Sequence, residues 1–265
     1  MTETRWQVPT ASPTLEQGHA HVWRIQLNDD DDSATHFANL SHEERTRAGR
    51  LQSPHHARRY TIAHGMLRHI LSLYTGVRAD ALIFAMGEFG KPYLSHPESA
   101  GSRFAHFNLS HSADLALVAV SKSGEVGVDV EFWRDNVAHL EIAERFFSPA
   151  EREWLRALHG NTHGVMRGFF SGWSRKEAYI KASGLGISRG LNHFDMSLEP
   201  NKPAILADRH DAQGTTRWAI ADIDVGARYS AAIVATAPLS IVRLYDASAF
   251  DIPKLDASVP DASHS

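Results

Sequence analysis

Two hydrophobic periodicities alternate along the chain, and their order is the strongest constraint on its fold. Apolar residues at helical spacing extend over about residues 54–75 and again over about 165–182. After each of these stretches come short apolar runs bounded by Gly and Pro, a pattern typical of strands. The order helix, strands, helix, strands therefore predicts an α+β protein built as two lobes of similar size.

The boundary between the predicted lobes falls near residue 125. We expect an N-terminal lobe over residues 21–125 and a C-terminal lobe over residues 126–245. Residues 1–20 and 246–265 are rich in Pro, Ser, Ala and Asp without a sustained period, so we predict that both are loose tails. No sequence repeat at a fixed spacing relates the two lobes.

Local signals predict the individual elements. Strands are predicted over residues 21–27, 82–86, 103–109, 115–121, 126–132, 217–223 and 229–236. Ser41 with Glu44, and Ser148 with Glu151, form capping-box patterns that predict two helix starts. Ser53 before Pro54 predicts a third helix start, and a further helix is expected over about residues 138–146.

Composition excludes several classes of protein. The chain has 265 residues, of which 43% are hydrophobic, and a formal net charge of −4. This length suffices to bury a core. The lack of cysteine excludes a disulfide scaffold, a thiolate zinc site and a thiol nucleophile. The mild acidity argues against nucleic acid as a partner, and no apolar run reaches the roughly 20 residues of a membrane span. We expect a cytoplasmic monomer that binds neither membranes nor nucleic acid.

The segment Gly127-Val128-Asp129-Val130-Glu131 is the sharpest local feature. Within a strand, Asp129 and Glu131 point to one face while the two valines point to the core. Converging carboxylates repel unless a cation lies between them, and Mg²⁺ takes one or two protein carboxylates together with waters and phosphate oxygens. By itself, however, the segment fits an ordinary half-exposed edge strand better than a metal site.

A second feature lies in the later helix, where Trp173, Glu177 and Lys181 follow one another at steps of four on one stripe. An exposed Glu–Lys pair is the ordinary interpretation, stabilising a helix by only about 0.2–0.5 kcal/mol. The bulky Trp173, and Phe169-Phe170 one turn earlier, place this pair beside the core instead. There a carboxylate can accept a metal or a proton, and an ammonium can hold a phosphate.

Two shorter segments carry polar groups suited to phosphate. Lys91 lies between Gly90 and Pro92, on backbone that directs its ammonium along a defined line. Ser110 and His111 offer a hydroxyl and an imidazole at a strand end. A Ser-His-Asp hydrolase is disfavoured, because adjacent strand residues point to opposite faces and Ser110 cannot reach the imidazole of His111.

The chain resembles the 4′-phosphopantetheinyl transferase superfamily in five segments that follow one another in order: GKPYL, FNLSHS, GVDVE, FFSPAEREWL and WSRKEAYIKASGLG. The resemblance is to the larger group typified by the surfactin synthetase activator and covers roughly residues 40–235. It implies a pseudo-two-fold pair of similar α+β lobes with the active site in the cleft between them. The implied reaction is the Mg²⁺-dependent transfer of the 4′-phosphopantetheine arm of coenzyme A to a serine of an apo acyl or peptidyl carrier protein, releasing adenosine 3′,5′-bisphosphate.

Matched motif by motif, the resemblance implies roles for particular residues. The metal ligands would be Asp129, Glu131 and Glu177, and Glu177 is alternatively the general base. The catalytic residues would be Asp129, Glu177 and Lys181. The residues that hold coenzyme A would be Arg47, Arg59, Lys91, Pro92, Ser110, His111 and Lys181.

One position departs from the family pattern. The segment from Ser41 to Arg47 resembles the family helix that presents cations to the 3′-phosphate of coenzyme A, but Glu44 stands where some relatives carry a lysine. Arg47 and Arg45 therefore both remain candidates for that contact, and a solvated helix face is the ordinary alternative.

Two other functions compete with the transferase. A Mg²⁺-dependent nuclease could use the same carboxylates, although such sites usually carry a lysine two residues after the strand acid, where this chain has Trp133. The other is a non-catalytic module that binds coenzyme A or a carrier protein. It is disfavoured because every acidic position of the signature is present.

Overall fold

A computed structural model describes residues 5–27, 33–95, 105–184 and 190–247, together with Thr2 and Gly186. The elements of the first half are β1 (His19–Gln26), α1 (Ser33–Asn39), α2 (His42–Arg50), α3 (Pro54–Thr75), the 3-10 turn η1 (Ala79–Ala81), β2 (Phe84–Met86), β3 (Pro92–Leu94), β4 (His106–Ser112) and β5 (Leu115–Ser121). The elements that follow are β6 (Val126–Phe132), α4 (His139–Phe146), α5 (Pro149–Ala157), α6 (Thr162–Ser183), η3 (Leu191–His193), β7 (Phe194–Met196), β8 (Ile205–Asp208), α7 (Gly214–Arg217), β9 (Trp218–Asp222), β10 (Tyr229–Thr236) and β11 (Ile241–Asp246).

The two halves repeat one topology, which confirms the α+β fold of two similar lobes. Each half runs from a strand through two short helices and one 22-residue helix to a two-stranded hairpin and then two long strands. The main sheets have the orders β1-β5-β4 and β6-β10-β9, so in each half the first strand pairs with the last. The sequence shows no repeat because topology depends on which faces are apolar, and many different residues satisfy that condition.

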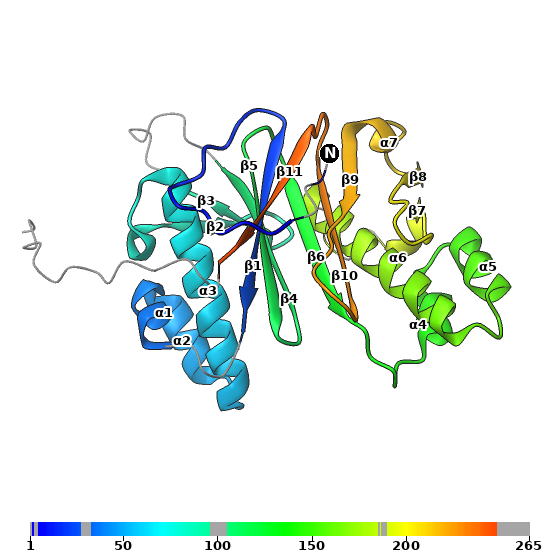
Figure 1. The fold of residues 1–265 in the computed structure, drawn as a ribbon, viewed down its shortest axis with the longest axis horizontal. Helices are drawn as coiled ribbons and strands as arrows, with labels where there is room; N and C mark the ends of the chain where they lie inside the picture. Colours follow the sequence, from blue (N-terminus) through cyan, green and yellow to red (C-terminus); the bar gives the residue numbers. More distant parts are fainter. Residues whose placement is uncertain are drawn as a thin grey trace, which may run out of the picture.

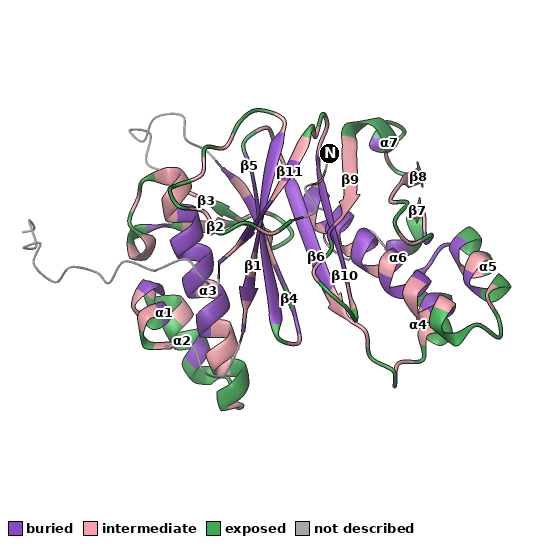
Figure 2. Cartoon of the chain, in the orientation of Figure 1, coloured by how far each residue is buried: buried purple, intermediate pink, exposed green. Residues whose placement is uncertain are grey.

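The chain folds into four layers, with one long helix on each outer side and the two sheets face to face between them (Figure 1). Apolar residues of α3 pack on the outer face of the first sheet, and those of α6 pack on the outer face of the second. A third cluster fills the space between the sheets, where Val22, Val128 and Ile233 are fully buried. Burial is accordingly densest along the central strands (Figure 2). Each large apolar side chain buried in this way contributes about 1.5–3 kcal/mol.

Both chain ends depart from the prediction of lobes and loose tails. The strand β11, which the predicted boundaries place in the C-terminal lobe, pairs in parallel with β1 in the first sheet. Thr2 and Gln7, in the segment predicted to be a loose tail, form bridges to β11. Hydrophobic periodicity indicates which face of a strand is buried but not which strand lies beside it. The pairing of β11 with β1 therefore could not be predicted from the local sequence. Residues 248–265 of the other predicted tail lie outside the described residues.

The two capping boxes form as predicted, and in each the capping glutamate also forms an ion pair with a basic residue of a long helix. In the second half, Glu151 caps Ser148 at the start of α5 and reaches the Lys176 ammonium of α6 at 2.8 Å. Lys176 is fully buried and donates to the carbonyls of Leu191 and Phe194, each at 2.7 Å. A buried charge is tolerated only when it is paired and hydrogen-bonded. This cluster therefore fixes α6 against the segment that follows it.

The first half contains an equivalent ion pair. Glu44 caps Ser41 at the start of α2 and lies 2.5 Å from the Arg68 guanidinium of α3. Arg68 donates to the carbonyls of Ala79 and Leu82 in the segment that follows α3. The acid at position 44 thus has a structural function within the first half.

Side chains join the two halves along the seam between β4 and β6, the facing edges of the two main sheets. Alternate residues of β4 accept hydrogen bonds from alternate backbone N–H groups of β6. The pairs are Asn108 with Val128 at 2.9 Å, Ser110 with Val130 at 3.4 Å and Ser112 with Phe132 at 3.1 Å. An exposed strand edge is otherwise a row of unpaired groups. Here the polar side chains of one half satisfy the edge of the other.

Most predicted elements are confirmed within small shifts of their ends. The strands over 115–121, 126–132 and 229–236 have the predicted bounds. The strand predicted over 103–109 is instead His106–Ser112 within the described residues. In the part of the chain that the structure describes, no helix is long and apolar enough to span a membrane.

Candidate active site between the two halves

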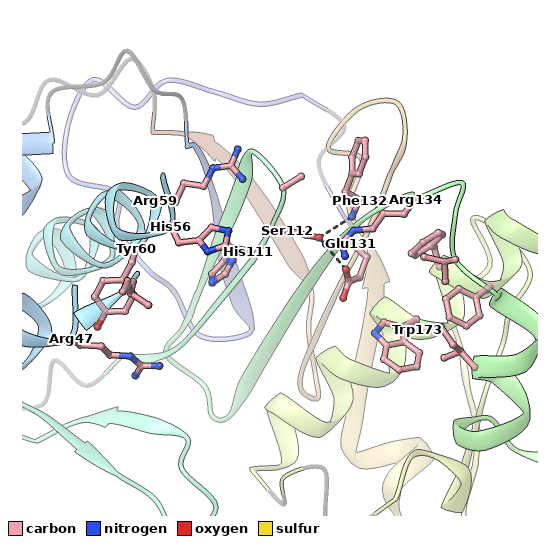
Figure 3. Close-up of a pocket in the computed structure, with 16 residues that line it drawn as sticks. Arg47, His56, Arg59, Tyr60, His111, Ser112, Glu131, Phe132, Arg134 and Trp173 are labelled. Carbon is pink, nitrogen blue, oxygen red and sulfur yellow. Dashed lines mark hydrogen bonds between the residues drawn. The ribbon is translucent and has the colours of Figure 1, made fainter. Parts of the chain in front are cut away.

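A cavity of about 750 Å³ opens between the halves, with walls from α2, α3 and β4 on one side and β6, α4 and α6 on the other. Figure 3 shows cationic and aromatic side chains of the first half facing Glu131 and Trp173 of the second. The polar and charged residues that line it include Arg47, His56, Arg59, Tyr60, His111, Ser112, Glu131 and Arg134. Such a cavity suits a large anionic ligand with an apolar portion.

Asp129 is held at the floor of the seam. Asp129 is 3% exposed, and its carboxylate accepts hydrogen bonds at Oδ1 from the Ser110 hydroxyl, 2.8 Å away, and from the Lys181 ammonium, 2.6 Å away. Its other oxygen, Oδ2, is buried and finds no hydrogen-bond partner among the described residues. Burial raises the pKa of Asp129, while Lys181 opposes that shift. The free oxygen marks a place where a cation would be stabilised.

Glu131 and Glu177 add two further carboxylates to this region. Burial, followed by the charge of Asp129, raises the pKa of Glu131 to about 7. The same two causes raise the pKa of Glu177. The charge of Asp129 thus acts on both Glu131 and Glu177.

The donor set fits Mg²⁺, with one difference from the expected three ligands. Within the described ranges, no three acidic or histidine side chains are grouped closely enough to hold a metal ion together. Lys181 and Ser110 both donate to Asp129 Oδ1, and Ser112 donates to Glu131. Mg²⁺ needs only one or two protein carboxylates and fills its remaining positions with waters and phosphate oxygens. The free oxygen of Asp129 and the mutually repelling carboxylates satisfy that requirement.

The structure separates the two arginine candidates of α2. Arg47 lines the cavity, with its guanidinium 5.5 Å from the ring centroid of Tyr60. Arg45 instead donates to the Ala38 carbonyl at 2.9 Å, and its guanidinium lies over Phe37. Geometry therefore favours Arg47.

Arg59 also lines the cavity, and it is ion-paired with Asp114 in the turn between β4 and β5. The Asp114 side chain is 62% exposed. An exposed ion pair of this kind is worth about 1 kcal/mol or less, so a bound phosphate can compete with it. Arg59 is therefore available to an anionic ligand.

Ser110 and His111 separate as expected for adjacent strand residues. Ser110 is buried and bonded to Asp129, and like Asp129, Glu177 and Lys181 it is not among the residues that line the two cavities. Its role as a phosphate contact stays a prediction. His111 lines the cavity. Its partial removal from water, followed by the charges of His64, Lys181 and Arg59, lowers the pKa of His111.

A second cavity of about 690 Å³ lies beside the hairpin of β2 and β3, and Lys91, Pro92 and Glu125 help to line it. The Lys91 ammonium lies 2.5 Å from Glu125 Oε2 and also donates to the carbonyls of Val126 and Ala182. Lys91 thus connects the hairpin of one half to β6 and α6 of the other. Its expected place in a ligand pocket is compatible with this position, since Lys91 and Pro92 both face the cavity.

Several residues that line the cavity were given no role from the sequence, although Ser112 ends the FNLSHS segment that carries part of the family resemblance. Tyr60 and His56 face the cavity from α3, and Ser112 faces it from β4. Tyr60 stacks on His64 with ring centroids 4.0 Å apart. Helical periodicity places Tyr60 on the apolar stripe of α3, but only the position of the second half makes that stripe part of a site.

The fold and the site together define a two-lobed α+β protein with a carboxylate and cation centre between its halves. Comparison with protein families agrees with this description. Residues 125–234 match the model of the 4′-phosphopantetheinyl transferase superfamily, and residues 28–123 match the model of the 4′-phosphopantetheinyl transferase N-terminal region. The two matches meet between β5 and β6.

Similar proteins carry the same name. The chain is 38% identical over 211 residues to the 4′-phosphopantetheinyl transferase HetI of Nostoc sp., covering 78% of this chain and 85% of HetI. It is 35% identical to the putative 4′-phosphopantetheinyl transferase slr0495 of Synechocystis sp., covering 68% of this chain and 70% of that protein. It is 31% identical to the 4′-phosphopantetheinyl transferase Sfp of Bacillus subtilis, covering 60% of this chain and 66% of Sfp. The chain belongs to the 4′-phosphopantetheinyl transferase superfamily.

Proposed function

We propose that this transferase uses Mg²⁺ and coenzyme A to modify a serine of an apo acyl or peptidyl carrier protein, with adenosine 3′,5′-bisphosphate as the second product. The observation that carries the proposal is the position of Asp129. Its free Oδ2 and its Lys181-bonded Oδ1 lie between the two halves, with Glu131 and Glu177 nearby. This combination suits a pyrophosphate, which needs a cation and an ammonium at once.

In the proposed reaction the carrier serine oxygen attacks the phosphorus that bears the pantetheine arm. A new P–O bond forms to the serine, and the bond from that phosphorus to the bridging oxygen breaks. The leaving oxygen departs with adenosine 3′,5′-bisphosphate, and the serine proton goes to a base. Bound at Asp129 and Glu131, Mg²⁺ would offset the negative charge that develops on the pyrophosphate.

Glu177 is the proposed base, with the metal site as its alternative place. Burial and the charge of Asp129 raise its pKa, which brings the carboxylate closer to the range where a general base is effective at neutral pH. The Lys181 ammonium would bind the pantetheine-side phosphate, and in doing so would give up part of its contact with Asp129. Its side chain is 28% exposed, so the ammonium can reach a ligand in the cleft.

The nucleotide end would meet the first half of the chain. Arg47 and Arg59 would hold the 3′-phosphate, with His111 beside the other phosphates. Lys91 and Pro92 would border the pocket for the adenine. The support for these roles is that Arg47, Arg59 and His111 line one cavity between the halves and Lys91 and Pro92 line the second.

The test is direct. Purified protein is incubated with coenzyme A, Mg²⁺ and a panel of apo acyl and peptidyl carriers, and each carrier is weighed. We expect at least one carrier to gain the mass of one phosphopantetheine group, and EDTA to prevent that gain. Binding of coenzyme A without any mass gain would support the non-catalytic alternative, and transfer that persists in EDTA would contradict the metal requirement.

We also propose that the enzyme acts in the cytoplasm as a monomer. The two halves of one chain supply both walls of the cavity, so the site needs no residue from a second copy. A cysteine-free chain is compatible with a reducing compartment. Sedimentation of the purified protein would check the mass in solution, and fractionation of the source cells would check the location.

A further inference from the structure

Ser112 makes two hydrogen bonds at once, and both involve β6. Its hydroxyl oxygen accepts the backbone N–H of Phe132 at 3.1 Å, and its hydroxyl hydrogen is donated to Glu131 Oε2 at 3.1 Å (Figure 3). Ser112 is 6% exposed. A serine hydroxyl carries only one hydrogen. When Phe132 occupies one lone pair, that hydrogen has a fixed partner in the Glu131 carboxylate.

Glu131 depends on this contact for its orientation. Among the described residues, Ser112 supplies the only side-chain hydrogen bond to the Glu131 carboxylate. Glutamate has several rotatable bonds and loses considerable conformational entropy when it is held in one geometry. Oε2 is held from β4, the other carboxylate oxygen makes no hydrogen bond among the described residues, and Glu131 is one of the residues that line the cavity.

The serines of β4 match the acids of β6 in spacing. Ser110 bonds Asp129 as Ser112 bonds Glu131, because both strands repeat every two residues. The two pairs differ in one respect: Asp129 also has the Lys181 ammonium, while Glu131 is paired with no cation among the residues described. Ser112 is therefore more important for the orientation of Glu131 than Ser110 is for the orientation of Asp129.

We propose that Ser112 is a positioning residue that holds Glu131 in the orientation in which its free oxygen binds the catalytic cation. The inference rests on the proposed Mg²⁺ site and deepens it. It also makes the seam part of the mechanism, because a residue of the first half fixes a metal ligand of the second. Removing a hydrogen-bond partner of a metal ligand typically weakens metal binding about 10–100-fold.

Asn108 provides a matched control on the same strand. Its side-chain oxygen accepts the N–H of Val128 at 2.9 Å, just as the Ser112 hydroxyl accepts that of Phe132, but Asn108 bonds no carboxylate among the described residues. Asn108→Ala and Ser112→Ala each leave one N–H of β6 without its acceptor. Loss of seam stability is thus common to both variants, and only Ser112→Ala releases a carboxylate.

The experiment measures Mg²⁺ and Mn²⁺ binding by calorimetry on the full chain, alongside Tm, for wild type and for Ser112→Ala, Ser112→Thr and Asn108→Ala. We expect Ser112→Ala to raise the metal Kd at least about tenfold. Ser112→Thr, which keeps the hydroxyl, should restore most of the affinity. Asn108→Ala should lower Tm but leave the Kd at the wild-type value.

Other results would overturn the inference. If Ser112→Ala binds metal as tightly as wild type, Ser112 does not position Glu131. If Asn108→Ala raises the Kd as much as Ser112→Ala, the effect belongs to the seam as a whole. If wild-type protein binds neither ion and still modifies a carrier in EDTA, the proposed metal site itself is wrong, and this inference falls with it.

Discussion

The Lys181 ammonium lies 2.6 Å from Asp129 Oδ1, which joins the C-terminal end of α6 to the middle of β6. Ser110 donates to the same oxygen from the other half of the chain. Oδ1 thus accepts one hydrogen bond from an ammonium of the second half and one from a hydroxyl of the first half. Oδ2 accepts none among the described residues. The arrangement holds Asp129 in place and leaves it one oxygen for a ligand.

Asp129→Ala should abolish most of the transferase activity. The change removes the free Oδ2 and the partner of Lys181, and should raise the reaction barrier by about 3–4 kcal/mol, or roughly 10²–10³-fold in kcat/KM. Steady-state kinetics at saturating Mg²⁺ would measure the loss. Asp135→Ala is the matched control, because Asp135 pairs with Arg228 and its side chain is 75% exposed. Equal kcat/KM for both variants would show that Asp129 is not part of the centre.

Lys176 and Lys181 should behave differently although they lie only five residues apart on α6. Lys176→Met leaves Glu151, 3% exposed, without its cation. Breaking a buried pair in this way costs about 3–5 kcal/mol, which corresponds to a fall in Tm of roughly 10 °C. Lys181→Met also leaves a buried carboxylate, Asp129, without its cation, so it should lower Tm as well, but it alone should lower kcat/KM sharply. Thermal unfolding and kinetics on both variants would check this, and a sharp loss of kcat/KM in Lys176→Met but not in Lys181→Met would contradict the assignment.

Arg47 and Arg59 should determine the preference for coenzyme A over dephospho-coenzyme A. Each charge-assisted contact to the 3′-phosphate should contribute about 1.5–3 kcal/mol where it is shielded, and less where it is solvated. Arg47→Ala and Arg59→Ala should therefore lose kcat/KM mainly with coenzyme A and narrow the preference. Arg45→Ala should leave the preference for coenzyme A unchanged, because the Arg45 guanidinium donates to the Ala38 carbonyl instead. If both variants keep the wild-type preference, the 3′-phosphate is bound elsewhere.

His21 should make the fold less stable at mildly acidic pH. Burial, followed by the charges of Arg243 and His19, lowers the pKa of His21 from 6.5 to about 3. Below about pH 6.5, His21 therefore binds a proton in the unfolded chain but stays neutral in the folded chain. The free energy of unfolding consequently falls as the pH drops from 6.5 toward 3. The slope from this residue is up to about 1.4 kcal/mol per pH unit.

Urea unfolding of wild type and His21→Gln between pH 5 and pH 7.5 would measure this contribution. Glutamine can still bond the Tyr74 hydroxyl, which lies 2.9 Å from His21 Nδ1, but it does not titrate. We expect a shallower pH dependence in the variant. Identical slopes would show that His21 is not the group responsible.

The sequence determined the local elements and the faces of the site residues. Both capping boxes formed at the predicted serines. Alternation in β6 placed Val128 and Val130 in the core and Asp129 on the other face, and the four-residue step in α6 aligned Glu177 with Lys181. These properties follow from the periods of strand and helix, which any short segment carries within itself. The ordered motifs also sufficed to predict the family.

Only the tertiary structure decided which elements lie opposite one another. The parallel pairing of β11 with β1 joins the two ends of the described chain, and the seam of β4 against β6 joins the two halves across the intervening strand β5. Two basic residues of one helix likewise have different surroundings: Lys176 pairs with Glu151 in the core, whereas Lys181 is partly exposed and pairs with Asp129 beside the seam. A period specifies the direction in which a side chain points. Its partner depends on how apolar faces from the whole chain pack together, and no local segment contains that information.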